Sequence, residues 1–528
     1  MINNRYKIRR KLGTGRSQVY LCTDLLNPSK DLAIKILSSA AQHKELDAFR
    51  NEYYLLKKID HPNIVHAYNY GTVLVIDKND PLDADIVEGS KFFTVDYIEG
   101  ETLDRYEIGN EIELLHKILE QICSVLYYIH QSNYIYYDLK PENLIISNGN
   151  GTPKVFFYDF GLTKFIPQNE PFDVQGTPNY IAPEILQISH VDHRADFYSL
   201  GIMLYYLIYN SFPFETDDEL KIYKANIEDD FEFPLKDGYE NLIHITRILL
   251  NKSPNNRYKT SLQILEELQI PISEQMKNTW TPIKTFCGRK KEIYDINSNL
   301  FNKKANEIIA IRGEDGSGKT FFLEEIHHNQ TNSILIEKSD LYSQNTFWNT
   351  LLRNVLYSEK IYNSIDDNLK SEIQELLNNV PDNLQEKLKS LFLRISRENN
   401  FLLLLDDFNS YDELSIELLK ELIPILQVNG VKIILSEDIG KPILSDFINN
   451  LSVFNLYPFS EADLSEYFDK SYFKIFPKHL LKDFVSNNSD LLPGNIAWLI
   501  KNLIFLNILE YHYNEVIFSN RSNSLNTI

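Results

Sequence analysis

One short stretch of the chain, YYDLKPENLII, constrains the fold of the first half more than any other. It places Asp138, Lys140 and Asn143 on one loop between apolar runs, and the FYDFG segment that follows adds Asp159 at the end of an apolar strand. A carboxylate can orient a hydroxyl and accept its proton, a lysine can offset charge on a moving phosphoryl group, and an amide with a carboxylate can hold Mg²⁺ on phosphate oxygens. These residue types therefore favour phosphoryl transfer from ATP to a hydroxyl.

The same stretch resembles the catalytic loop and the metal-binding loop of protein kinases, in which a lysine two residues after the catalytic aspartate is typical of Ser/Thr-specific members. The resemblance implies that Asp138 accepts the proton and that Lys140 contacts the γ-phosphate. It also implies that Asn143 and Asp159 are the Mg²⁺ ligands.

The segments before this loop resemble the nucleotide-binding elements of the same family, in the same order. LGTG supplies Gly13 and Gly15 for a loop over the phosphates, although the third glycine is missing and the segment up to Val19 is one residue short. Lys35, in Ala-Ile-Lys, stands where the family has the lysine that contacts the α and β phosphates. Glu52, on the amphipathic segment that follows, is its expected partner.

FFTVDYIEGETL resembles the last strand of the small lobe running into the hinge. By this resemblance the backbone from Asp96 to Ile98 hydrogen-bonds the adenine, and Val95 is the gatekeeper. Tyr136 and Tyr137 replace the family's His and Arg before the catalytic aspartate, and this absence of Arg resembles kinases that do not need phosphorylation of the activation segment. Further family landmarks follow in order at Thr177, Ala182 to Glu184, Asp196 and Arg257.

A second nucleotide motif, GEDGSGKT, fits the P-loop pattern in full and follows a predicted strand. Its glycines are Gly313, Gly316 and Gly318, and its last two residues are Lys319 and Thr320. Successive backbone N–H groups at the start of a helix can cradle phosphates, the lysine can reach the β and γ positions, and the threonine hydroxyl can bind Mg²⁺. The motif predicts a P-loop NTPase in the second half.

The continuous apolar run NFLLLLDDF is typical of a buried parallel strand that ends in two carboxylates, Asp406 and Asp407. By resemblance to P-loop NTPases, Asp406 holds Mg²⁺ through water and Asp407 orients the attacking water. Ser436, at the end of the next predicted strand, stands at the place of a phosphate sensor. LYPFSEADLSEYF and LLPGNIAWLIKNL resemble the helical lid of AAA-type and STAND ATPases, in which a turn of small residues near the start of the last lid helix faces the nucleotide.

Composition narrows the class of protein further. The chain of 528 residues is too long for one core and predicts roughly two to four domains. Its net charge of −21 argues against sequence-independent nucleic-acid binding, which depends on neutralising phosphates with Lys and Arg. Three widely separated cysteines indicate neither a disulfide framework nor a metal site. The N-terminus lacks a secretory signal and no apolar run is long enough to span a membrane, so the cytoplasm is the expected compartment.

These patterns predict a two-lobed α+β protein kinase fold followed by an α/β P-loop NTPase with a helical lid. The expected boundaries are residues 1–268 for the kinase domain (small lobe 1–97, large lobe 98–268), 269–284 for a linker, 285–456 for the NTPase core, and 457–528 for the lid and the start of a further unit.

The leading hypothesis is an ATP- and Mg²⁺-dependent Ser/Thr kinase whose second module regulates or relays its output in signalling. We expect protein substrates, no nucleic-acid or membrane partner, and self-association through the NTPase module. The alternative is a nucleotide-binding pseudokinase scaffold, favoured by Tyr136, Tyr137 and the irregular glycine loop, with the NTPase as the main activity.

Overall fold

The structure is a computed structural model of the chain. It describes residues 1–528 apart from 4, 16, 26–27, 29, 77–85, 110, 149–152, 166–173, 188–190, 215, 272–285, 302–307, 331, 338–345, 379–382, 444–450, 472–477, 506–508, 513–514 and 519–528. Most of the expected linker, from residue 272 to 284, therefore lies outside the described residues. Among the described helices, none combines the length and the apolar character that a membrane span requires.

The chain opens with a small lobe built on a five-stranded antiparallel sheet, in the order β1-β2-β3-β5-β4. Its elements are β1 (Tyr6–Thr14), β2 (Ser17–Asp24), β3 (Asp31–Leu37), α1 (His43–Lys58), β4 (Ala67–Thr72) and β5 (Lys91–Asp96). A capping box between Gln42 and Glu45 begins α1, and Lys57 and Lys58 lie in its last turn, where they favourably face the negative end of the helix dipole. Phe49 and Tyr53 on α1 pack against Phe93 of β5, so the helix is fixed on the sheet.

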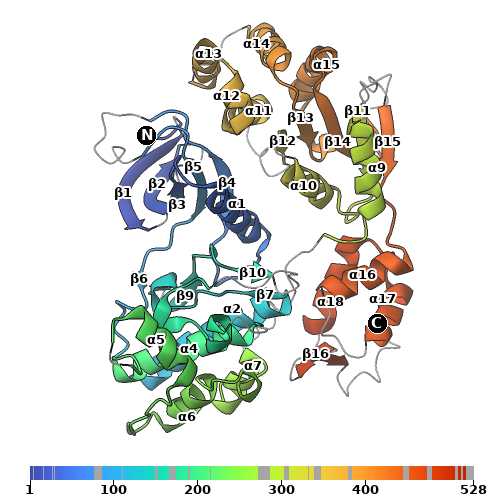
Figure 1. The fold of residues 1–528 in the computed structure, drawn as a ribbon. Coiled ribbons are helices and arrows are strands. Elements are labelled where there is room, and N and C mark those ends of the chain that lie inside the picture. Colours follow the sequence, from blue (N-terminus) through green and yellow to red (C-terminus); the bar gives the residue numbers. More distant parts are fainter. Residues whose placement is uncertain are drawn as a thin grey trace.

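The large lobe is mainly helical and lies beyond the small lobe along one side of the molecule (Figure 1). Its elements are β6 (Glu101–Thr102), α2 (Ile112–Gln131), β7 (Tyr134–Ile135), η2 (Pro141–Asn143), β8 (Leu144–Ser147), β9 (Lys154–Phe157), β10 (Lys164–Phe165), η4 (Pro178–Tyr180), α3 (Pro183–Leu186), α4 (Arg194–Tyr209), α5 (Glu219–Glu228), α6 (Glu240–Leu249), η5 (Pro254–Asn256) and α7 (Ser261–Glu267). The YYDLKPEN stretch connects β7 to β8, and β8 pairs with β9, which leads to Asp159. The loop that carries Asp138 and the segment that carries Asp159 therefore lie side by side.

The second module contains a five-stranded parallel sheet in the order β12-β13-β14-β11-β15. Its elements are α9 (Lys290–Phe301), β11 (Ile308–Gly313), α10 (Lys319–Asn329), β12 (Ser333–Ile336), α11 (Thr346–Tyr357), α12 (Glu359–Ser364), α13 (Asp367–Asn378), α14 (Leu384–Glu398), β13 (Leu402–Leu405), η7 (Phe408–Ser410), α15 (Glu413–Val428), β14 (Lys432–Asp438) and β15 (Leu451–Asn455). All four residues of β13 are buried, as expected for a central parallel strand.

Three helices follow the sheet, α16 (Glu461–Ser471), α17 (Lys478–Asn488) and α18 (Pro493–Phe505), and then a hairpin of β16 (Leu509–His512) and β17 (Glu515–Phe518). Buried residues of these helices join the hydrophobic core of the large lobe in one contiguous cluster. The predicted fold class, a two-lobed α+β fold followed by an α/β module with the P-loop between β11 and α10, is confirmed.

Candidate active site and a second nucleotide site

Lys35 connects three elements of the first site. Its Nζ lies 2.7 and 2.9 Å from the two carboxylate oxygens of Glu52 on α1, and 3.1 Å from Oδ1 of Asp159 after β9. Burial alone would lower the pKa of Lys35, but the two carboxylates outweigh it and raise that pKa above its usual value. Burial would raise the pKa of Asp159, but Lys35 outweighs it and lowers that pKa. The lysine is therefore a fixed positive charge at the junction of sheet, helix and metal-binding loop.

The catalytic loop brings Asp138, Lys140, Asn143 and Thr177 together. Lys140 Nζ lies 2.8 Å from Oδ2 of Asp138 and donates to the Thr177 hydroxyl at 2.7 Å. The Asn143 amide donates to the carbonyl oxygen and to Oδ2 of Asp138, at 2.8 and 3.1 Å. Thr177 donates its backbone N–H to Oδ1 of Asp138 at 3.2 Å. Three residues thus surround the Asp138 carboxylate: Lys140 and Asn143 from the same loop, and Thr177 from the segment before α3.

Asp196, at the start of α4, holds the loop from beneath. Its carboxylate is fully buried and accepts the backbone N–H groups of Tyr136 and Tyr137, both at 2.8 Å, and contacts Nε2 of His130 at 2.7 Å. Tyr137 has a φ of 75°, which is unfavourable for a residue with a large side chain. Asp196 therefore stabilises a strained backbone directly before Asp138.

Tyr136 stands where the resemblance to protein kinases places a histidine, and its side chain makes aromatic contacts there. Its ring lies edge-on to Phe157 and Phe160, with centroids 5.2 and 5.1 Å away. Its buried hydroxyl has no hydrogen-bond partner within the described part of the chain. The ring supports the metal-binding loop by packing, because the hydroxyl contributes no hydrogen bond there.

The glycine loop and the hinge lie on the small-lobe sheet. Gly13 is opposite Val19 in the β1–β2 register, and Val19 is opposite Lys35 in the β2–β3 register, so the loop leads to the lysine. The Asp96 side chain accepts hydrogen bonds from the His66 N–H and the Tyr68 hydroxyl. This carboxylate therefore fixes the hinge, and Ile98 packs partly buried against the core beside it.

The first site has the ligands that Mg²⁺ prefers. Because the Asn143 amide nitrogen donates to Asp138, the amide oxygen is turned away from that residue. Asp159 uses Oδ1 for Lys35 and for the Gly161 N–H. An amide oxygen and a carboxylate oxygen are hard ligands of the kind Mg²⁺ takes beside substrate phosphates, so these residues fit the ion.

The P-loop wraps the start of α10. Gly318, the N-cap, and Gly316 have φ angles of 88° and 83°, which only glycine adopts at low cost. Lys319 Nζ donates to the carbonyl oxygens of Gly313 and Glu314, at 2.6 and 3.0 Å. The loop therefore has the turned backbone that a phosphate cradle requires.

The end of β13 completes the second site. Asp406 accepts from the Thr320 hydroxyl through Oδ2 and from the Ser436 hydroxyl through Oδ1, both at 2.7 Å. Burial raises the pKa of Asp406, although these two hydrogen bonds act to lower it. Asp407 has a left-handed φ of 46° and donates its N–H to Ser436 Oγ at 2.7 Å. A hydroxyl beside a carboxylate suits Mg²⁺, so this donor set fits the ion too.

The lid closes on the P-loop through one backbone contact. Gly494 donates its N–H to the Gly316 carbonyl at 2.8 Å, and a Cβ at position 494 would lie 2.8 Å from the Gly316 Cα. The next residue but one, Ile496, is fully buried in the lid core. The first turn of α18, the last helix of the predicted lid, therefore lies against the P-loop, and it needs glycine at position 494.

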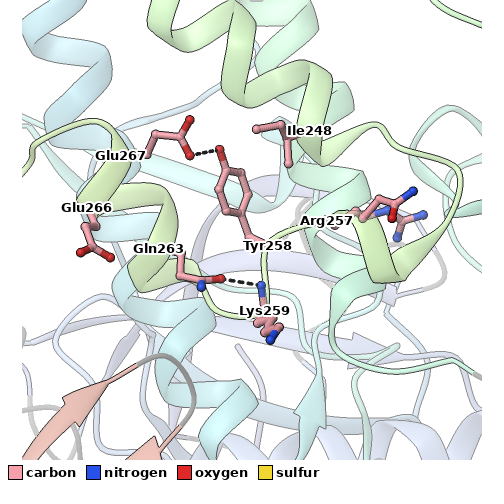
Figure 2. A pocket seen from close by; sticks show the side chains of 8 residues that line it. Ile248, Arg257, Tyr258, Lys259, Gln263, Glu266 and Glu267 are labelled. Atoms are coloured by element: carbon pink, nitrogen blue, oxygen red, sulfur yellow. Dashed lines mark hydrogen bonds between the residues drawn. The ribbon is translucent and has the colours of Figure 1, made fainter.

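A separate hollow of about 460 Å³ lies at the base of the large lobe, between α6, η5 and α7. In Figure 2, Tyr258 points to Glu267, to whose carboxylate its hydroxyl donates at 2.5 Å, and Gln263 accepts the Lys259 N–H at 2.7 Å. Arg257, at its edge, pairs with Glu184 instead, at 2.7 and 2.9 Å. No residue predicted for either nucleotide site lines this hollow.

Two contributions to the sites were not predicted. Ser436 is predicted as a phosphate sensor, and in the structure it also bridges Asp406 and Asp407. Arg312 pairs at 2.7 Å with the fully buried Glu437, which anchors β14 beside β11. Neither contact could be read from the sequence, because each joins side chains of different strands.

Two family models match the chain, one in each half. The protein kinase domain model matches residues 6–270, just over half of the chain, and the AAA ATPase domain model matches residues 285–434.

Similar curated proteins are kinases. A calcium/calmodulin-dependent protein kinase type 1 of Macrobrachium nipponense is 29% identical over 243 residues, which are 44% of this chain and 64% of that protein. A probable serine/threonine-protein kinase, MARK-C, of Dictyostelium discoideum is 27% identical over 309 residues, 56% of this chain and 36% of its own length. The serine/threonine-protein kinase cds1 of Schizosaccharomyces pombe is 27% identical over 296 residues, which are 53% of this chain and 58% of that protein. The chain thus spans less than two thirds of each of these three relatives.

Proposed function

Because the chain belongs to the protein kinase family, we propose that it transfers the γ-phosphoryl group of ATP to Ser or Thr hydroxyls of protein substrates. The observation that carries this proposal is the set of contacts around Asp138, where Lys140, Asn143 and Thr177 all meet one carboxylate. Lys35, already paired with Glu52 and Asp159, supplies the charge for the phosphates.

Each residue has a defined task in this proposal. Asp138 orients the substrate hydroxyl and accepts its proton, while Lys140, 2.8 Å away, offsets negative charge on the transferred group. Asn143 and Asp159 would hold Mg²⁺, which neutralises charge on the β and γ phosphates when bound. Lys35 orients the α and β phosphates.

Phosphate transfer to a generic protein substrate tests the proposal, with labelled ATP and Mg²⁺ and with Asp138→Asn as the matched control. The substitution keeps the side-chain shape and removes the proton acceptor, so label incorporation should fall by about 10²-fold or more. Equal label in both proteins would instead support a nucleotide-binding scaffold.

The second module, in this proposal, binds Mg·ATP at its P-loop and regulates or relays the output of the kinase, as a STAND-type module would. Its support is the P-loop geometry, with Thr320 on Asp406 and Gly494 on Gly316. Lys319→Ala should abolish nucleotide binding at this site, while residues 1–275 alone should still transfer phosphate. A fragment that binds no ATP would contradict this modular organisation.

A further inference from the structure

The helix that carries Glu52 contacts the second module with its opposite side. Glu52 and Lys57 are five residues apart on α1, so their side chains point about 140° apart around the helix axis. On one side Glu52 pairs with Lys35, and on the other Lys57 forms an ion pair with Glu337, directly after β12. The two side chains of this outer pair are 25% and 15% exposed, so solvent only partly screens it. Helix α1 therefore lies between the small-lobe sheet and the second module.

Two aromatic contacts join the same faces of α1 and α10. The Lys58 ammonium lies 5.2 Å from the centre of the Phe321 ring, and the Tyr54 ring lies 4.5 Å from the His328 ring, nearly perpendicular to it. Phe321 and His328 are seven residues apart, which places them on one face of α10. The other face of α10 is buried in the sheet of its own module through Phe322, Leu323 and Ile326.

Charge on the two faces is complementary. Lys57 and Lys58 of α1 face Glu324 and Glu337 of the second module. Burial and the neighbouring Glu337 raise the pKa of Glu324 to about 7, while the two lysines act in the opposite direction. Losing the lysines would leave two carboxylates beside each other in a partly buried place, so the contact is specific for basic residues on α1.

Leu74 anchors this interface at a second point. It follows β4, is 3% exposed, and belongs to the hydrophobic core that α11 and its neighbours form in the second module. Helix α11 packs against β4 itself. The small lobe is thus attached both through its sheet and through α1.

The face of α10 that contacts α1 begins next to the nucleotide site. Lys319 and Thr320 open the helix, Thr320 bonds Asp406, and Phe321 is the next residue. A rigid helix transmits a displacement of its first turn to the turns that follow it. Events at the P-loop are therefore mechanically connected to α1.

We propose that Lys57 is a positioning residue for phosphate transfer, which holds α1 through Glu337 so that Glu52 pairs with Lys35. In this way the second module sets the activity of the kinase through the contact of α1 with α10. The inference rests on the proposed function and identifies the surface through which the regulation acts.

Charge reversal in the full chain tests this inference. We expect Lys57→Glu and Glu337→Lys each to lower kcat/KM for ATP by at least about fivefold, the size of a typical coupling between sites. The double variant restores opposite charges and should return to within about twofold of the parent. Lys117→Glu is the matched control, because this exposed lysine of α2 makes the same charge change away from the interface and should leave the rate unchanged.

Thermal unfolding of the parent and the four variants separates positioning from folding, since a positioning residue changes kcat/KM without a matching change in Tm. The inference is overturned if the single variants act like the parent, or if the double variant is no better than the two single effects combined.

A parent that transfers no phosphate would instead refute the proposed function. In that case ATP affinity at the first site, measured in a Lys319→Ala background, still tests the interface. Lys57→Glu should weaken this ATP affinity, and adding Glu337→Lys to Lys57→Glu should restore it.

Discussion

Replacing Asp196 by Asn should disable the catalytic loop without touching the nucleotide. The carboxylate accepts three contacts, one on Oδ1 from Tyr137 and two on Oδ2 from Tyr136 and His130. An asparagine has a single acceptor oxygen, so its NH₂ group must face at least one buried backbone N–H. Losing a charge-assisted hydrogen bond and leaving one donor unsatisfied costs about 2–4 kcal/mol of unfolding free energy.

The same change should release the strained backbone at Tyr137, which costs about 1–3 kcal/mol to hold. Asp138 then shifts, and a displacement on the order of 1 Å lowers the rate by roughly 10²-fold. Urea unfolding and steady-state phosphate transfer measure the two effects.

Asp192→Asn is the control, because Asp192 is 20% exposed and pairs with Arg194 outside the loop. The reasoning is refuted if Asp196→Asn matches this control within about 0.5 kcal/mol and keeps the parental rate.

Three further changes probe other parts of the kinase domain. Burial lowers the pKa of His61 to about 3, below its unfolded value, so the folded state binds fewer protons and loses stability as pH falls. In urea unfolding, the parent should lose about 2 kcal/mol more unfolding free energy between pH 7 and pH 5 than the His61→Gln variant does. Equal losses in the two proteins would contradict the assignment of this pH dependence to His61. Tyr136→Phe removes a buried hydroxyl without a described partner and should raise the unfolding free energy by about 1 kcal/mol; a loss would show that the hydroxyl is satisfied. Glu184→Gln leaves Arg257 charged and fully buried, so it should cost about 3–5 kcal/mol in the same assay, and a cost near zero would refute this.

Motifs whose residues lie close in sequence were readable without a structure. The positions of Lys35, Asp138 and Asn143 follow from short patterns that a phosphate and a metal require, and the P-loop lies between the strand and helix that its pattern predicts. The order of the kinase and NTPase folds along the chain followed from these motifs, because each motif is specific to one type of structural element.

Contacts between distant segments were not readable. Lys57 and Glu337 are 280 residues apart, and a lysine in the last turn of a helix is equally typical of a solvated helix end. The role of Ser436 depends on which strand lies beside β13, which the sequence order does not reveal. Tyr136 departs from the family pattern, and only its packing on Phe157 and Phe160 explains what the ring does.

Direct titration of nucleotide binding to the full chain in the presence of Mg²⁺ tests the central claim most directly. Two separate sites predict two nucleotides bound per chain, with one remaining after Lys35→Met, one after Lys319→Ala, and none after both. A parent chain that binds a single nucleotide, or none, would contradict the claim.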